Sequence, residues 1–477
     1  MKYIETEIVV IGSGPGGYAA AFYAADHGKK VILVEKDLEL GGVCLNRGCI
    51  PSKALLHAAH LLNEVRHSKE MGISFGEAKI DLDKLRSWKD SILRKLSQGV
   101  RSMGKMRGVE VMHGRGYLED SRTLRVETTE GQKFVRFQKA ILAVGSEPAM
   151  PKAFDLGNKR IMTSTEALEL EDVPARLLIV GGGYIGMELG TVYAALGSKI
   201  VLVEALPNIL AGADPDLVRP VMKFALAHFE EVRLSSKVLK METYLKQIKV
   251  ISETAGQKRE ELYDRVLVSV GRKPNCDELG LKNTKVALDE KGFVKVDVHQ
   301  QTSDPAILAI GDVAGGVMLA HKAVKEARVA VEYLCGEATA FEDIVMPAVV
   351  FTQPEVAWCG LTEAEAKAKG IEVKVARFPW AALGRALTIN KPDGLTKLIL
   401  DPDTERVLGV GIVGSGAGDI ISEGVLAVEM GATAKDIAES IHPHPTLSET
   451  LMETAEVFYG ISANSMSGRK IERQPQT

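Results

Sequence analysis

Short apolar runs recur along the chain, separated by glycine turns and helix-forming segments. The run at 8–11 leads through a glycine-rich turn into an alanine-rich helix at 18–26, and then into a second apolar run at 31–34. The same order of run, turn, helix and run returns between 177–180 and 200–203. Runs of four apolar residues bounded by turns are typical of strands buried in a parallel sheet. The pattern therefore predicts an α/β fold that contains two βαβ units.

The rest of the chain predicts further strands and helices around these units. Residues 55–106 are predicted to be mostly helical, and short alternating segments over 109–135 predict a small antiparallel piece. From about Met346, strands and helices alternate without a glycine fingerprint, which is typical of an α+β domain. Further strands are predicted at 140–146, 262–272, 307–312, 349–352, 373–378, 395–401 and 407–413. Helices are predicted at 363–369, 417–430 and 434–439, and the polar tail from Ala463 is predicted to be disordered.

The first glycine turn carries a nucleotide-binding signature. Gly12, Gly14 and Gly17 form G-x-G-x-x-G between the predicted strand and helix, and Glu35 ends the next strand 18 positions after Gly17. Glycines at this spacing let a pyrophosphate approach the free N–H groups of a helix N-terminus, and the later acid accepts ribose hydroxyls. A purely structural turn is the alternative. The surrounding strand, helix and acid favour a dinucleotide site.

The same fingerprint occurs a second time. Gly181, Gly183 and Gly186 stand 169 positions after the glycines of the first, and Glu204 follows them at the spacing that the first acid has. The repetition predicts two dinucleotide sites in one chain. An acid at Glu204 repels a 2′-phosphate, so the second site is predicted to take NAD rather than NADP.

Two cysteines lie five positions apart shortly after the first βαβ unit. On a regular helix the Cα atoms of Cys44 and Cys49 would be roughly 8.6 Å apart, whereas a disulfide needs about 4.4–6.8 Å. A bond between them would therefore need an irregular backbone, which Gly48 and Pro51 permit. A strained bond of this kind is typical of easily reduced, catalytic disulfides. Two inert buried thiols and a metal-binding pair are the alternatives.

Composition and charge narrow the class of protein. The 477 residues are 45% hydrophobic and 26% charged, with a net charge of −4, so the chain lacks the basic character of nucleic-acid binders. No apolar run reaches the roughly 18 residues of a membrane span, and the first strand begins too early to leave room for a signal peptide. Five cysteines are too few for a secreted disulfide scaffold. The sequence therefore predicts a cytoplasmic protein with no nucleic-acid partner and no membrane span.

Together, these motifs resemble a known family. Two fingerprints flanking Cys-x4-Cys, with His-Pro-Thr-Leu-Ser-Glu at 444–449, are similar to the class I pyridine nucleotide–disulfide oxidoreductases. The stretches GGVCLNRGCIPSKALLH, GGGYIGMELGTVYAALGS, AIGDVAG, LAHKA and PEVAWCGLTEAEAK extend the resemblance over about 5–460. It implies two Rossmann-like domains and an α+β dimerisation domain. The implied boundaries are 1–148 for FAD binding, 149–275 for NAD binding, 276–345 for a central domain that completes the FAD site, and 346–477 for the interface.

The resemblance also implies roles for individual residues. Cys44 would meet the substrate sulfur and Cys49 would lie against the flavin. Lys53 would lie near the flavin and pair with Glu188, and Tyr184 would gate the nicotinamide pocket. FAD would be bound by Gly12, Gly14, Gly17, Glu35 and Asp312, and NAD by Gly181, Gly183, Gly186 and Glu204. Further expected cofactor contacts are Lys53, Gly145, Ser146, Tyr184, Gly271 and Ala320.

The C-terminal histidines are the candidates for proton transfer. The resemblance implies that His444 is the acid/base group, oriented by Glu449, supplied by the partner subunit and followed by a cis bond to Pro445. An imidazole suits this task because it exchanges protons near neutral pH. His442 is the rival candidate, and the His-x-His pair is also a possible metal-binding pattern. No cysteine or histidine cluster supports a metal, so none is expected. Asp312, taken alone, has a helix N-cap or a turn as its structural alternative.

The activity implied by the resemblance is oxidation of dihydrolipoyl groups with NAD⁺. The enzyme would be a homodimer that acts on lipoyl domains of 2-oxo acid dehydrogenase or glycine cleavage complexes. Another NADH-dependent flavin disulfide reductase and a flavin-loaded scaffold protein are the alternatives. Other members of the family fit less well. An NADPH-dependent enzyme would need basic residues after Glu204, and a mercuric reductase would need a cysteine pair near the C-terminus, but the sequence has neither. A soluble transhydrogenase would lack the second cysteine, which is present here as Cys49. The chain departs from the family pattern at Arg47, whose charge would favour a thiolate, and at Pro443.

Overall fold

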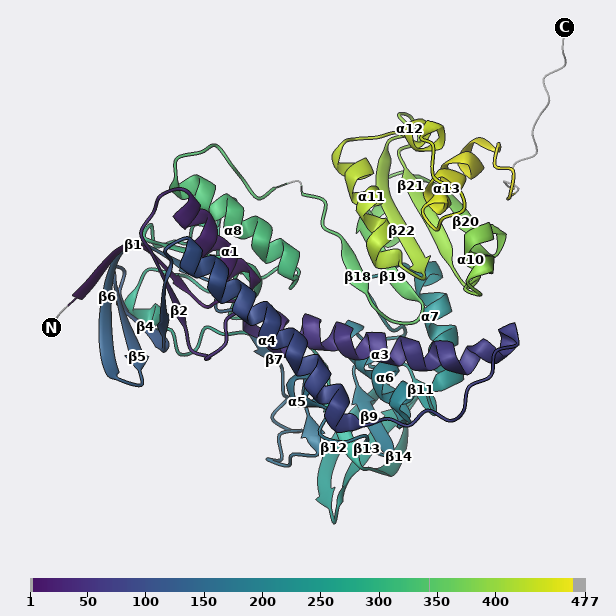
Figure 1. Ribbon diagram of the computed structural model, residues 1–477, viewed down its shortest axis with the longest axis horizontal. Coiled ribbons are helices and arrows are strands. Elements are labelled where there is room, and N and C mark those ends of the chain that lie inside the picture. The colour runs from purple at the N-terminus through teal and green to yellow at the C-terminus, as the bar shows by residue number, and fades with distance from the viewer. Residues whose placement is uncertain (1–2, 343, 466–477) are drawn as a thin grey trace, which may run out of the picture.

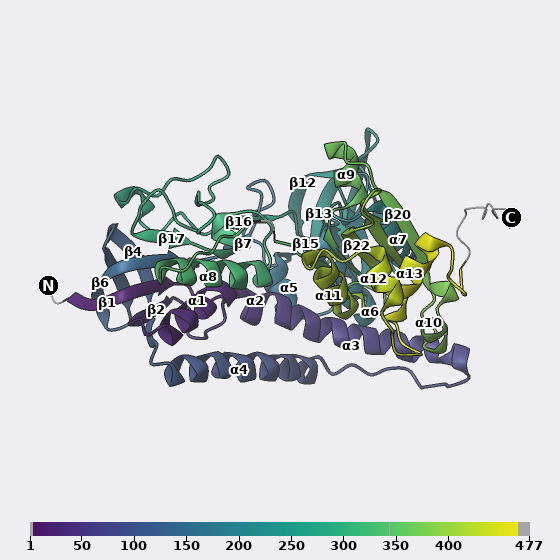
Figure 2. The same cartoon turned by 90° about the horizontal axis from the view of Figure 1, so that it is seen from above.

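The computed structural model describes residues 3–342 and 344–465, and its strands form three larger and two smaller sheets. The first sheet lies at one end of the molecule, at the left of Figure 1, and the second and third lie towards the other end. Helices α3 (Cys49–His67) and α4 (Leu82–Met106) run along one side, as Figure 2 shows. Within the described residues, no helix is long and apolar enough to cross a membrane. The tail predicted to be disordered lies mostly at 466–477, outside the described residues.

The first unit is built on a seven-stranded sheet in the order β3-β2-β1-β6-β5-β4, with β17 paired to β6. β1 lies parallel between β2 and β6, because its apolar residues are buried on both faces; Val9 and Val10 are 0% exposed. Its strands are β1 (Tyr3–Ile11), β2 (Val31–Glu35), β3 (Glu110–His113), β4 (Arg115–Asp120), β5 (Thr123–Thr128), β6 (Gly131–Leu142) and β17 (Ile307–Ala309). Its other helices are α1 (Pro15–Asp26), α2 (Gly42–Arg47) and α8 (Ala320–Leu334).

Two predictions for this unit are confirmed in part. The predicted antiparallel piece over 109–135 is present as β4, β5 and the start of β6, whereas β3 pairs parallel with β2. The piece continues the parallel sheet because β6 is long: it pairs with β5 over residues 131–136 and with β1 over residues 134–142. The predicted helical stretch 55–106 is confirmed except at 72–81, which has no helix between the 3-10 turn Ser68–Met71 and α4.

The second unit repeats the βαβ arrangement with a five-stranded parallel sheet in the order β11-β10-β9-β15-β8. A three-stranded antiparallel sheet, β12-β13-β14, is joined to it. The parallel strands are β8 (Ile161–Met162), β9 (Arg176–Val180), β10 (Lys199–Val203), β11 (Glu231–Arg233) and β15 (Arg265–Val268). The antiparallel strands are β12 (Ser236–Tyr244), β13 (Gln247–Thr254) and β14 (Gln257–Tyr263), and the helices are α5 (Ser164–Glu169), α6 (Tyr184–Leu196) and α7 (Pro215–His228).

The predicted single strand at 262–272 is wrong, because the chain there forms parts of three strands. It ends β14 at Tyr263, forms β15, and enters β16 (Arg272–Pro274), which pairs with β7 (Ser146–Pro148). Asp264 causes the first break: its carboxylate accepts the Arg176 N–H at 2.8 Å, so the chain changes partner sheet at that residue. The β7–β16 ribbon connects the first unit to the second.

The third unit is an antiparallel sheet, β18-β19-β22-β21-β20, which helices cover. This confirms the predicted α+β character after residue 346, including helices α9 (Glu363–Lys369) and α12 (Ala434–Glu439). The strands are β18 (Ala348–Val350), β19 (Glu355–Gly360), β20 (Lys374–Pro379), β21 (Leu395–Leu400) and β22 (Val407–Gly414). The remaining helices are α10 (Gly384–Thr388), α11 (Ala417–Glu429) and α13 (Glu449–Tyr459); β19, α10 and α13 were not predicted.

Candidate functional site

The first glycine turn opens onto the main cavity of the molecule. Gly12 has φ +98°, and a Cβ there would lie 2.4 Å from the Ala143 carbonyl oxygen. A Cβ at Gly17 would lie 1.9 Å from the Gly12 carbonyl oxygen, so the turn and α1 pack too closely for a side chain. A Cβ at Gly14 would meet nothing within 4 Å. The turn therefore leaves its free backbone at Gly14, where a ligand phosphate can approach the helix N-terminus.

Glu35 is held in place behind this turn. It is 5% exposed, and its Oε2 accepts the Ser13 N–H at 2.8 Å and the Ser13 hydroxyl at 2.6 Å. Its Oε1 accepts the Asp37 N–H at 2.9 Å. The carboxylate lies at the end of β2 and lines the cavity, which is the position predicted for a ribose-binding acid.

The second glycine turn has nearly the same geometry. Gly181 has φ +108°, a Cβ there would lie 2.4 Å from the Ser269 carbonyl oxygen, and a Cβ at Gly186 would lie 2.0 Å from that of Gly181. A Cβ at Gly183 would again meet nothing within 4 Å. Glu204 accepts the Gly182 N–H at 2.5 Å and the Leu206 N–H at 2.7 Å. The residues present therefore fit a second dinucleotide in the same way as the first.

The main cavity has about 1250 Å³, with solvent at its mouth included, and residues from both glycine-turn units line it. A second cavity of about 990 Å³ shares Gly12, Lys36, Val144 and Asn275 with it and extends along residues 114–116. The two adjoining cavities together are large enough for a dinucleotide such as FAD. The 114–116 wall was not predicted, because this short strand entry has no recognisable motif.

The two cysteines lie on the main cavity at a break between helices. Cys44 lies in α2 and Cys49 begins α3, with Gly48 between them at φ −146°, ψ −113°. This confirms the predicted irregular backbone. A Cβ at Gly48 would lie 2.9 Å from the Val43 carbonyl oxygen, so the break also depends on a glycine. Both cysteines are free thiols in the structure.

The two thiols have opposite acidities. A hydrogen bond from Cys44 to Cys49, together with burial, raises the pKa of the Cys44 thiol well above its ordinary value. The same hydrogen bond, aided by the Lys53 cation, lowers the pKa of Cys49 from 9.0 to about 7. Cys49 is therefore the thiol that ionises near neutral pH.

Glu188 connects all three units beside this dithiol. It is 3% exposed and lies on α6 of the second unit. Its carboxylate accepts Lys53 Nζ at 2.8 and 3.0 Å and the Ser52 hydroxyl at 2.9 Å, both from α3 of the first unit. It also accepts the Phe351 N–H of the third unit at 3.0 Å. The Lys53–Glu188 pair predicted from the sequence is thus present, and Tyr184, one turn earlier on α6, lines the same cavity.

Asp312 closes the opposite wall of the cavity. It accepts the Ser146 hydroxyl at 2.5 Å, and that hydroxyl in turn accepts Arg272 Nε at 2.7 Å. Asp312 is not an N-cap of the following helix, because α8 begins at Ala320 with Leu319 as its N-cap. The sequence analysis missed Arg272, which lies directly after Gly271 and lines the cavity with Ser146, Asp312 and Ala320. Gly145 and Gly271 have φ of +68° and +134°, as the tight connections around β7 and β16 require.

The two C-terminal histidines bind different carboxylates. His444 Nδ1 lies 2.8 Å from Glu449 Oε1, and the Thr446 N–H donates to the other carboxylate oxygen at 2.7 Å. His442 Nε2 lies 2.7 Å from Glu423 instead. The predicted pairing of His444 with Glu449, and the cis bond after His444, are both present. The His444 side chain is 78% exposed, and residues 441–449 are not among those that line the cavity holding Cys44.

Arg47 does not serve the thiols directly. Its guanidinium pairs with Asp37 at the cavity edge, and the cation that acts on the pKa of both cysteines is Lys53. The cation that favours a thiolate at Cys49 is therefore Lys53 on α3 and not Arg47.

The chain belongs to the pyridine nucleotide-disulphide oxidoreductase family. Residues 6–327 match that family, and residues 346–455 match its dimerisation domain. The fold is therefore α/β, with two Rossmann-like dinucleotide-binding units and a C-terminal α+β dimerisation domain. Members of this kind use FAD and NAD.

Named relatives and solved structures agree with this membership. The dihydrolipoyl dehydrogenase of Vibrio cholerae is 46% identical over 460 residues, which cover 96% of this chain and 97% of the relative. The dihydrolipoyl dehydrogenase of Staphylococcus aureus is 44% identical over 463 residues, covering 97% and 98%. A solved copper(II) complex of the HOCl-induced flavoprotein disulfide reductase RclA from Escherichia coli superposes with a TM-score of 0.86 at 27% identity, covering 96% and 100%.

Proposed function

We propose that this protein oxidises protein-bound dihydrolipoyl groups and reduces NAD⁺, as a homodimer whose active sites are shared between subunits. The observation that carries the proposal is the Cys44–Cys49 dithiol on the main cavity, beside the pair of Lys53 with the buried Glu188. The relatives named dihydrolipoyl dehydrogenase support the choice of substrate, since they match nearly the full length of the chain.

The residues that would hold FAD are those that line the main cavity and the second cavity beside it. The Gly12–Gly17 turn would receive the pyrophosphate, Glu35 the ribose hydroxyls, and Asp312 with Ser146 the linking chain. Gly181, Gly183, Gly186 and Glu204 would hold NAD, with Tyr184 at the passage between the two. When bound, FAD supplies a two-electron carrier between the dithiol and NAD⁺. The protein's own task is to orient the reacting sulfurs and to move protons.

Substrate oxidation would begin from the Cys44–Cys49 disulfide. A dihydrolipoyl thiolate attacks Cys44 Sγ, the Cys44–Cys49 bond breaks, and Cys49 leaves as a thiolate. The second dihydrolipoyl sulfur then attacks the lipoyl sulfur that is bound to Cys44. The lipoyl disulfide closes, the bond to Cys44 breaks, and Cys44 is released. The lipoyl group has lost two electrons and the Cys44–Cys49 pair has gained them. The low pKa of Cys49, about 7, makes it the better leaving group of the two cysteines.

His444 of the partner subunit would take the proton from the attacking dihydrolipoyl thiol. Its Nδ1 is engaged by Glu449, which leaves Nε2 as the proton acceptor. The exposed position of this imidazole, away from the cavity that Cys44 lines in the same chain, supports supply across a dimer interface.

The proposal extends to the organisation of the chain and its location. The division at 148/149, 275/276 and 345/346 is supported by the β7–β16 ribbon and by the return of β17 to the first sheet. The predicted cytoplasmic location and the lipoyl domains as partners are part of the same proposal.

Cys49→Ser tests the dithiol. The variant should lose at least about 10³-fold in dihydrolipoamide:NAD⁺ turnover, because interchange needs both sulfurs, while the protein still purifies with FAD. Anaerobic mixing of the wild type with dihydrolipoamide and then NAD⁺ should yield NADH. A wild type whose flavin is reduced by NADH but not by dihydrolipoamide would point to another disulfide substrate. No reaction with either donor would favour a scaffold protein.

Mixed dimers test the shared active site. The Cys44→Ser and His444→Gln homodimers should each be inactive. A mixed dimer with one subunit of each contains one intact site, so it should recover up to half of the activity of a wild-type dimer. Confirmed subunit exchange without recovered activity would contradict supply of His444 by the partner.

A further inference from the structure

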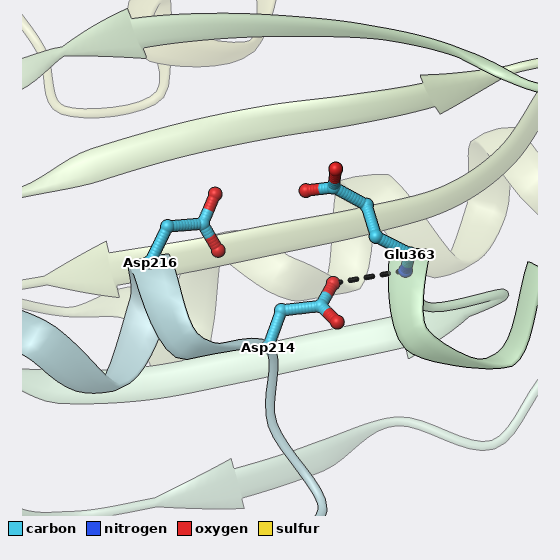
Figure 3. A group of neighbouring side chains, drawn as sticks. All are labelled: Asp214, Asp216 and Glu363. Carbon is cyan, nitrogen blue, oxygen red and sulfur yellow. Dashed lines mark hydrogen bonds between the residues drawn. The ribbon is translucent and has the colours of Figure 1, made fainter. Parts of the chain in front are cut away.

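Lys397 lies at the centre of three carboxylates that meet at the boundary between the second and third units. Its side chain is 1% exposed, and its Nζ lies 2.6 Å from Asp214, 2.8 Å from Asp216 and 2.8 Å from Glu363. Figure 3 shows the three acids close together, Asp214 and Asp216 at the start of α7 and Glu363 at the start of α9. Because the lysine ammonium already supplies the cation, the cluster is an ionic contact between units and not a metal site.

The contact joins segments that are distant in sequence. Lys397 belongs to β21 of the third unit, whereas Asp214 and Asp216 begin α7 of the second unit. Asp214 is 3% exposed and also accepts the N–H groups of Glu363 at 3.0 Å and Ala364 at 3.2 Å. Arg377 on β20 pairs with Asp216 and Glu363 but does not contact Asp214 among the hydrogen bonds of the described residues. Lys397 is thus the side chain that neutralises Asp214.

The segment next to this contact packs against the second glycine turn. Only nine residues separate Glu204 from Asp214. Within them, the Leu210 N–H donates to the Gly182 carbonyl at 3.0 Å, and the Ile209 side chain lies where a Cβ on Gly182 would approach to 2.9 Å. Ile209 is 0% exposed. The loop is therefore held at one end by the second glycine turn and Glu204, and at the other by Lys397.

We propose that Lys397 is a positioning residue for NAD: through Asp214 and Asp216 it holds the 205–213 loop against the second glycine turn. The dimerisation domain would thereby contribute to nucleotide affinity without touching the nucleotide. The inference rests on the assignment of the second fingerprint to NAD under the proposed function.

Removing the ammonium should release the loop. In Lys397→Met, Arg377 still neutralises Asp216 and Glu363, but Asp214 keeps only backbone donors in a buried place. A buried carboxylate without its cation draws in water or a proton, and either change displaces the start of α7. The expected result is a loop that packs less tightly on Gly182, which weakens NAD binding and leaves the dithiol cavity unchanged.

The test uses the FAD-loaded dimer and measures NAD⁺ affinity directly by calorimetry, alongside steady-state kinetics. Lys397→Met should weaken NAD⁺ binding and raise KM for NAD⁺ by about tenfold, the size of one lost charged contact. The maximal rate and the rate of anaerobic reduction by dihydrolipoamide should stay within about twofold, since neither depends on this loop. Unchanged NAD⁺ affinity in a folded, flavin-bound variant would overturn the proposal.

Two further variants separate positioning from loss of stability. Arg265→Met removes a buried arginine of the second unit that pairs with Glu171 and Asp172 and makes no contact with residues 205–214 among the salt bridges of the described residues, so it should lower the melting temperature but not NAD⁺ affinity. Asp214→Asn combined with Lys397→Met removes the unpaired charge, so it should regain stability while NAD⁺ affinity stays low. Wild-type affinity in the double variant, or an equal loss in Arg265→Met, would contradict a positioning role.

An assay without lipoyl substrate distinguishes failure of the inference from failure of the proposed function. NADH oxidation with ferricyanide needs no lipoyl substrate and reports on the nucleotide and flavin sites without the dithiol. A wild type that binds NAD⁺ but does not oxidise dihydrolipoamide would refute the proposed function and leave the role of Lys397 to be decided by the affinities. A wild type that binds no NAD⁺ would overturn both.

Discussion

The two glycine turns are built almost identically, yet their surroundings differ. In each, the first glycine has φ near +100° and lies against a neighbouring backbone carbonyl, and the middle glycine faces open space. Behind the first turn, Ser13 donates its hydroxyl to Glu35. Behind the second turn, Gly182 takes the place of that serine because Ile209 and Glu204 approach too closely for a side chain. The turn thus provides general dinucleotide binding, and the elements behind it set the details of each site.

The difference extends to the chemistry. The first turn is followed by the dithiol and α3, so the reactive groups belong to the first unit. The second unit adds one carboxylate, Glu188, which reaches across to Lys53. Under the proposed function, the two copies of one binding motif therefore have unequal roles, the first near the reacting sulfurs and the second as the acceptor site.

The largest effect is expected for alanine at the third glycine of each turn. Gly17→Ala places a Cβ 1.9 Å from a backbone oxygen, and Gly186→Ala one at 2.0 Å. Backbone overlap of this size should destabilise the unit by more than about 3 kcal/mol. We expect Gly17→Ala to yield protein without flavin, and Gly186→Ala to retain flavin but lose NAD⁺ binding. Flavin content and NAD⁺ titration measure both, and flavin loss from Gly186→Ala would mean that the two units do not fold separately.

A smaller effect is expected when the acids at the strand ends lose their charge. Glu204→Gln should weaken NAD⁺ binding by about tenfold or more, because charged hydrogen bonds contribute about 1.5–3 kcal/mol. Glu35→Gln is the matched control and should weaken FAD retention while NAD⁺ affinity is unchanged. Calorimetric titration with NAD⁺ decides the comparison, and equal effects of both variants would contradict separate sites.

The contribution of the second unit to the dithiol is visible in the pKa of Cys49. The Lys53 cation lowers that pKa and the Glu188 carboxylate raises it. Lys53→Met should therefore move the pKa of Cys49 above its value of about 7, and Glu188→Gln should move it below. The rate of iodoacetamide alkylation of the reduced protein, measured against pH, rises as the thiolate forms and reports the shift. Shifts in the same direction for both variants would contradict this electrostatic account.

The smallest effect is expected at Arg47. Its pair with Asp37 is 40% and 33% exposed, and exposed pairs contribute about 0–1 kcal/mol. Arg47→Val should leave the pKa of Cys49 and the melting temperature nearly unchanged. A clear rise in that pKa would restore the sequence-based expectation that Arg47 favours the thiolate.

Local pattern predicted much of this protein. The glycine spacings, the acids at 35 and 204 and the short apolar runs were sufficient to predict both βαβ units, since a strand, a turn and a helix are decided by neighbouring residues. The irregular backbone between Cys44 and Cys49 followed from their spacing together with the assumption that the two cysteines pair. The helix bounds of α9 and α12 agreed because each helix follows a threonine that forms a capping box with the acid three residues later.

Other features were decided by contacts between distant segments. The break of the predicted 262–272 strand depends on Asp264 meeting the Arg176 N–H, and Arg272 gains its place only when β16 pairs with β7. In the sequence, Lys397 is one residue of an ordinary predicted strand. In the folded chain it is buried beside Asp214 and forms an ion pair between two units. The sequence by itself determined the repeated βαβ units and the position of the cysteine pair after the first of them, because those depend on local spacing. Only the tertiary structure decided which charges are buried together, because burial depends on segments that meet after folding.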